Sequence, residues 1–84
     1  MKPRRTLEKA IAGSKNIAFD DLVQLAKAFG FQFKRTRGSH HVFGHPRIPE
    51  ILNLQNRKGQ AVPYQIRQLL RFVDQYGLTL EEDL

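Results

Sequence analysis

The sequence predicts an α+β domain in which helices cover one face of a small three-stranded antiparallel sheet. Two observations indicate this class. Apolar residues recur at helical spacing in residues 7–12, 21–29 and 66–73, whereas residues 31–55 hold short apolar and aromatic runs separated by glycine and proline. A chain of 84 residues allows only one modest core. We therefore expect residues 1–84 to form a single domain.

Two helices are expected before the sheet. Thr6 can cap a short helix over residues 7–12, and Asp20 can cap a stronger helix over residues 21–29. The stronger helix has an apolar stripe made of Leu22, Leu25, Ala26 and Phe29. Gly30 follows it at the position where a left-handed residue commonly ends a helix.

Three strands are expected in the middle of the chain. Residues 31–36 are rich in aromatic side chains and alternate in polarity, and after a turn at Arg37 and Gly38 residues 39–45 supply the partner strand of a hairpin. Pro46 and Pro49 bracket a short connection to a third strand over residues 50–55.

The loop of this hairpin decides which side chains share a face, and two registers are open. A two-residue loop of Arg37 and Gly38 pairs Arg35 with His40, whereas a three-residue loop over residues 36–38 pairs Arg35 with Ser39. One residue of difference therefore decides which histidine lies beside the basic strand.

A final helix should begin near Pro63 and end at Gly77. Residues 79–82 have the spacing of a capping box and can begin one further turn. The central order of helix, three strands and helix resembles the double-stranded-RNA-binding fold, with an extra helix at the N-terminus. By this analogy of fold, RNA is a candidate partner.

The charge distribution favours a polyanionic partner. The net charge is +6, and residues 34–71 contain eight lysine and arginine side chains against Glu50 alone. Cysteine is absent, which excludes disulfides and thiolate chemistry and fits a cytoplasmic protein. No apolar run approaches the roughly 20 residues that a transmembrane helix needs, so we expect no membrane association.

All three histidines fall within six positions, at His40, His41 and His45, between a Gly-Ser turn and a proline. Imidazole can exchange a proton or bind a metal near neutral pH. Adjacent strand residues point to opposite faces and no carboxylate precedes Glu50 in this stretch, so we expect no metal site.

Several short motifs together resemble the HicA-type (YcfA-like) toxins, small bacterial ribonucleases. The motifs are Phe29-Gly30-Phe31, Arg37-Gly38-Ser39-His40-His41-Val42-Phe43, His45-Pro46, Pro63-Tyr64-Gln65-Ile66-Arg67-Gln68-Leu69-Leu70 and Tyr76-Gly77-Leu78. The resemblance covers about residues 17–78. The chain departs from the family pattern in residues 51–59, which lack the Val-Pro-His ending of the third strand, and in its longer N-terminal region.

The resemblance implies a metal-independent endoribonuclease that cuts mRNA, needs no cofactor and is neutralised by a HicB-type antitoxin. The catalytic histidine of the family's Gly-Ser-His motif corresponds to His40, and His41 is the alternative. The residues expected to contact RNA are Arg35, Arg37, Ser39, Lys58 and Arg67. A non-catalytic RNA-binding module of the same fold is the alternative function.

Overall fold

The computed structural model describes residues 1–81 and contains three helices and one three-stranded sheet. The elements, in chain order, are α1 (Pro3–Ile11), α2 (Phe19–Ala28), β1 (Gln32–Arg37), β2 (His40–His45), β3 (Ile48–Gln55) and α3 (Pro63–Tyr76). The predicted α+β class and the predicted order are therefore confirmed, while the likeness to the double-stranded-RNA-binding fold stays a prediction. The possible turn at residues 79–82 extends beyond the described residues.

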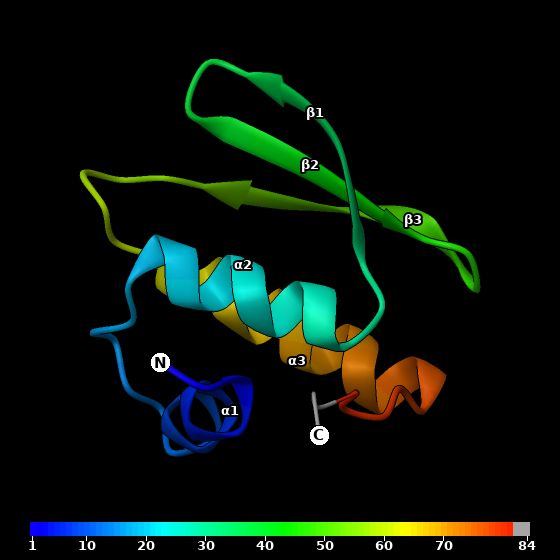
Figure 1. Ribbon diagram of the computed structural model, residues 1–84, viewed down its shortest axis with the longest axis horizontal. Coiled ribbons are helices and arrows are strands. Elements are labelled where there is room, and N and C mark those ends of the chain that lie inside the picture. Colours follow the sequence, from blue (N-terminus) through cyan, green and yellow to red (C-terminus); the bar gives the residue numbers. More distant parts are fainter. Residues whose placement is uncertain (82–84) are drawn as a thin grey trace.

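The elements form three layers (Figure 1). The antiparallel sheet has the order β1-β2-β3, α2 and α3 both lie under one of its faces, and α1 packs against these two helices on the side away from the sheet. None of the helices in residues 1–81 is long and apolar enough to cross a membrane.

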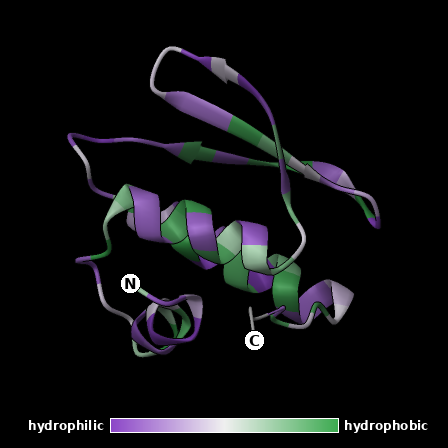
Figure 2. Ribbon diagram, viewed as in Figure 1, coloured by the Kyte–Doolittle hydropathy of each residue, from purple (hydrophilic) through white to green (hydrophobic). Residues whose placement is uncertain are grey.

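The core lies between the sheet and the helix pair. The sheet, α2 and α3 all contribute fully buried side chains to it, among them Leu22, Leu25, Phe43, Leu52, Leu54 and Leu69. Hydrophobic and hydrophilic residues alternate around α2, so that only one side of this helix is apolar (Figure 2). The other face of the sheet carries no helix (Figure 1).

Both predicted N-caps are wrong. α1 begins at Pro3, whose fixed φ suits the first turn, and Thr6 is fully buried inside the helix, where its hydroxyl donates to the Lys2 carbonyl at 3.4 Å. α2 begins at Phe19, because burial of this ring in the core extends the helix past Asp20. Asp20 lies instead in the first turn, where its negative charge interacts favourably with the helix dipole.

Neither predicted hairpin register is correct. The loop consists of Gly38 and Ser39, with Gly38 at φ 61° in the first loop position, and it pairs Arg37 with His40. A bulge follows between Phe33 and Arg35, so that Phe33 pairs with Phe43. The sequence pattern could not reveal this bulge, because the extra residue leaves the alternation of polarity ambiguous.

The third strand is longer than predicted. β3 begins at Ile48 and not at Glu50, so the connection between β2 and β3 consists of Pro46 and Arg47 alone. Pro49 is tolerated inside β3 because β3 is an edge strand and one side of its backbone needs no ladder hydrogen bond.

A small polar cluster joins the start of β3 to the end of α3. The Tyr76 hydroxyl donates to the Glu50 carboxylate, and Arg47 Nη2 donates to the Tyr76 carbonyl at 3.5 Å. The hydrogen bond to Glu50, together with desolvation and the carboxylate charge, raises the pKa of Tyr76 above its ordinary value of 10.0.

This pKa gives a test of the cluster. In a Tyr64→Phe background, where Tyr76 is the remaining tyrosine, ultraviolet titration should give a pKa above 10.0, and Glu50→Gln should lower it. The stabilising contribution should be fully present below pH 10.0 and lost as the pH rises through the raised pKa. An unchanged pKa in the Glu50→Gln variant would show that the two side chains do not interact in solution.

Candidate active site

The hairpin register sends neighbouring histidines to opposite faces of the sheet. Phe43 lies in the core, so His41 and His45, two residues to either side, also face the helices, and His40 faces away from them. We call the helix-free face the outer face. It carries Lys34, Arg35, Arg37, His40, Val42, Asn53 and Gln55.

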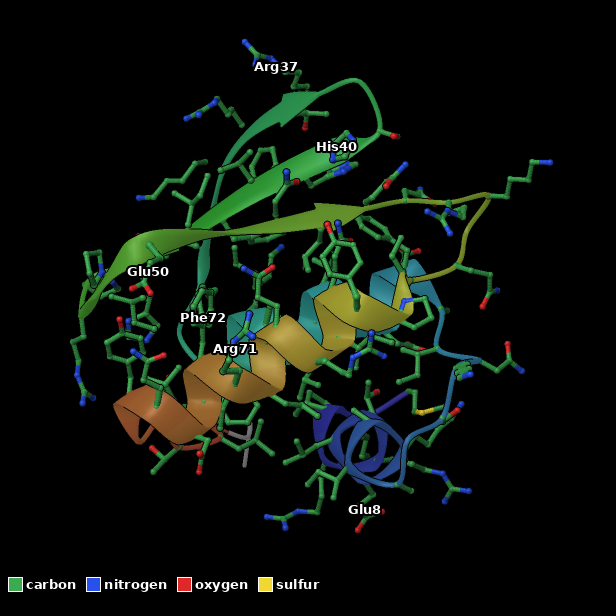
Figure 3. The ribbon with its side chains drawn as sticks, turned by 180° about the vertical axis from the view of Figure 1, so that it is seen from behind. Glu8, Arg37, His40, Glu50, Arg71 and Phe72 are labelled. Atoms are coloured by element: carbon green, nitrogen blue, oxygen red, sulfur yellow. The ribbon has the colours of Figure 1, made fainter. Side chains whose placement is uncertain are left out.

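His40 is the histidine that shares this face with the arginines. Its direct cross-strand neighbours are Arg37 on β1 and Gln55 on β3, and Arg37 points away from the helices beside the hairpin turn (Figure 3). The His40 ring is partly exposed, its Nδ1 atom is buried without a hydrogen-bond partner, and its Nε2 atom remains accessible. An accessible ring nitrogen among cations is suited to proton transfer beside a phosphate.

The basic side chains of β1 place positive charge along the face that carries this ring. Arg35 pairs with Val42, and Lys34 lies across Gly44, because its Cε atom is 2.9 Å from the point that a Cβ atom on Gly44 would occupy. Within residues 1–81 no carboxylate forms an ion pair with Lys34, Arg35 or Arg37. Their charge is therefore available to an anionic ligand.

His41 lies on the helix-facing side and is held by the protein. Its Nδ1 atom donates to the Ser39 carbonyl at 3.2 Å, and its ring centroid lies 4.8 Å from that of Phe19 and 6.3 Å from that of Phe33. It shares no face with Arg35 or Arg37. This arrangement favours His40 over His41 as the reactive ring.

His45 has a structural role that the sequence did not suggest. The Arg47 backbone N–H donates to His45 Nδ1 at 3.1 Å, so Nε2 carries the proton and donates to the Phe29 carbonyl, also at 3.1 Å. Its ring also contacts Phe31 edge to face at 5.1 Å. His45 therefore ties the end of β2 to the end of α2.

The remaining predicted RNA contacts are not all near His40. The Ser39 carbonyl accepts hydrogen bonds from Asn56 and from His41, whereas its hydroxyl has no partner in the described part of the chain. The bond from Asn56 places the following loop, with Lys58 at its tip, at the same end of the sheet. Arg67 is exposed on α3, in the layer under the other face.

Lys34 and Asn53 lie on the outer face but were not among the predicted site residues. The bulge that sends Lys34 across Gly44 has no sequence signal. The position of Asn53 does have a sequence signal. It lies between Leu52 and Leu54, which are buried, so the alternation of side chains along a strand directs it away from the core. Only the register between β2 and β3, however, brings it beside His40.

The histidines do not converge on a common point. His40 lies on the outer face, and His41 and His45 each hydrogen-bond backbone atoms on the other side. Among residues 1–81, no three histidine or carboxylate side chains form a group that could hold a metal ion.

The comparison with protein families identifies a match over most of the chain. A family model described as the HicA toxin of bacterial toxin-antitoxin matches residues 19–74, from α2 into α3, and so includes the whole sheet but not α1. No curated protein and no solved structure matches the chain.

Proposed function

The chain belongs to the family of HicA toxins of bacterial toxin–antitoxin systems, and from this we propose that it is an endoribonuclease that cleaves mRNA without a metal ion. Membership in the family also implies an antitoxin partner. The observation that supports the activity best is the position of His40, whose accessible ring nitrogen lies on the same face as Arg35 and Arg37.

The reaction needs only groups that this face offers and a water molecule. His40 Nε2 takes the proton of a ribose 2′-hydroxyl, the 2′-oxygen forms a bond to the adjacent phosphorus, and the bond from phosphorus to the 5′-oxygen breaks. The departing oxygen takes a proton from a water molecule, the hydroxide left behind takes the proton held by His40, and the products are a 2′,3′-cyclic phosphate and a 5′-hydroxyl. Negative charge builds on the phosphate in the transition state, and Arg35 and Arg37 stabilise it.

Binding of the RNA chain uses the wider basic surface. Lys34 and Lys58 extend the positive charge along β1 and beyond the end of β3, which suits the backbone of an RNA strand. Ser39 contributes its free hydroxyl at the turn. Arg67, in the helix layer, contacts RNA that passes around the end of the sheet near Lys58.

The antitoxin is a HicB-type protein that covers the outer face. An acidic surface on this partner would neutralise Arg35 and Arg37 and exclude RNA from His40. The protein acts on mRNA in the cytoplasm, where the toxin and its antitoxin are both made.

The activity can be tested by incubating the purified chain with single-stranded RNA in excess EDTA. We expect cleavage at the same rate with EDTA and with Mg²⁺, and products that end in a 2′,3′-cyclic phosphate. RNA with 2′-O-methyl groups throughout should remain intact, because the attacking hydroxyl is blocked.

A different result would favour the alternative function. RNA that is bound in a salt-sensitive manner but stays intact would identify a non-catalytic RNA-binding module. In either case, Arg35→Gln should reduce the slope of log affinity against log salt by about one if this arginine contacts a phosphate.

A further inference from the structure

The outer face contains an unusual pair of polar atoms. Within residues 1–81, His40 Nδ1 and Asn53 Oδ1 are the two buried side-chain atoms that have no hydrogen-bond partner. A buried polar atom without a partner is costly, and native proteins keep few of them outside functional sites. The occurrence of both on one small surface calls for a common explanation.

The strand register makes the two residues neighbours. β2 and β3 pair Val42 with Asn53 and His40 with Gln55, so Asn53 is the diagonal neighbour of His40 on the same face. Diagonal neighbours in an antiparallel sheet are close enough for side chains of this length to interact. Gln55, the direct neighbour, has no buried unpartnered side-chain atom.

The chemistry of the two atoms is complementary. A neutral imidazole carries its proton on one ring nitrogen and a lone pair on the other, and an amide oxygen can only accept a hydrogen bond. If the Asn53 oxygen accepts from Nδ1, the lone pair must lie on Nε2, which is the accessible nitrogen.

We propose that Asn53 is a positioning residue for His40. Its side-chain oxygen accepts the Nδ1–H of His40, directly or through one buried water, and thereby holds the tautomer in which Nε2 is free to act as a base. The consequence for catalysis rests on the proposed function, but the hydrogen bond and the tautomer do not. The opposite orientation of the amide would donate to Nδ1 and favour the Nε2–H tautomer, so the two orientations predict different protonation of the ring.

The tautomer can be measured without RNA. Two-dimensional ¹⁵N–¹H spectra of the histidine rings in the full chain, recorded at alkaline pH, distinguish a protonated Nδ1 from a protonated Nε2. We expect His40 to be in the Nδ1–H form in the wild-type protein and to shift toward the Nε2–H form in Asn53→Ala and in Asn53→Leu, which keeps the volume of the side chain. Asn53→Asp should retain the Nδ1–H form, because a carboxylate also accepts.

Two matched controls separate positioning from a general disturbance of the sheet. Gln55→Ala alters the direct neighbour of His40 and should leave its tautomer unchanged. The ring signals of His45, which is held by Phe29 and Arg47, report whether each variant keeps the fold. A wild-type His40 in the Nε2–H form, or a tautomer that does not respond in well-folded Asn53→Leu, would overturn the proposal.

The activity of the same variants separates this inference from the proposed function. If the wild-type chain cleaves RNA, Asn53→Leu should lower the cleavage rate of bound RNA by about tenfold or more and change its pH profile, with RNA affinity nearly unchanged. Asn53→Asp should restore cleavage in part. If the wild-type chain does not cleave RNA, the proposed function fails while the tautomer measurement still decides the role of Asn53. A normal rate and pH profile in Asn53→Leu would refute the positioning role alone.

Discussion

Replacement of His40 by alanine is expected to slow RNA cleavage by about 10²- to 10⁴-fold, the range that a positioned acid or base supplies. The free energy of unfolding should change by no more than about 1.5 kcal/mol, because the ring is partly exposed on the helix-free face and the hydrogen bond inferred with Asn53 contributes about 0.5–1.5 kcal/mol. Cleavage of a labelled RNA under single-turnover conditions measures the first quantity, and urea unfolding followed by circular dichroism measures the second. RNA affinity should stay close to that of the wild type, since Arg35 and Arg37 remain.

His41→Ala is the matched variant, one residue away and on the opposite face. It removes the hydrogen bond to the Ser39 carbonyl and the contact with Phe19, so it should cost about 1–2 kcal/mol of stability while most of the cleavage persists. If His40→Ala cleaves RNA normally and His41→Ala does not, the reaction takes place on the helix-facing side of β2, and the assignment to His40 is wrong.

Gly30→Ala is expected to give a large loss of stability, about 3 kcal/mol of a total that for such domains is about 5–15 kcal/mol. Gly30 has φ 98°, where an alanine is strained by about 1–3 kcal/mol. Its new Cβ atom would lie 2.8 Å from His45 Nε2 and displace the ring that joins β2 to the Phe29 carbonyl. Loss of that hydrogen bond adds about 1–3 kcal/mol. Urea unfolding measures the sum.

Gly13→Ala controls for the backbone term. Gly13 has φ 84°, similarly left-handed, but a Cβ atom there would meet nothing within 4 Å. Gly13→Ala should therefore lower the free energy of unfolding by the backbone strain alone. Equal losses at the two positions would show that the contact with His45 carries no energy. In the His45→Ala background the substitution at Gly30 should cost less, because the clash is removed.

Much of the architecture follows from local patterns in the sequence. Helical spacing in residues 21–29 and the left-handed position at Gly30 predicted how α2 ends, and Pro63 marked the start of α3. The Gly-Ser-His motif pointed to the family that the comparison then established. These features depend on residues that are close in the chain, so the sequence alone carries them.

The helix starts were harder to predict from local preference. Thr6 and Asp20 are good capping residues, yet α1 and α2 both begin earlier, at Pro3 and Phe19. A proline that suits the first turn and the burial of an aromatic ring outweighed the preference for a polar cap, which contributes only about 1 kcal/mol.

Only the tertiary structure decides which position each of the three histidines takes. Which face each ring takes depends on the Gly38-Ser39 loop and on the bulge at Lys34, and a shift of one residue would exchange His40 and His41. The sequence therefore determined that imidazoles and arginines occur together. Strand pairing places His40 beside Arg37 and Asn53, and the hydrogen bond to the end of α2 gives His45 a structural role. Only the tertiary structure decides these contacts, because they join residues that are far apart in the chain and no local pattern specifies how they align.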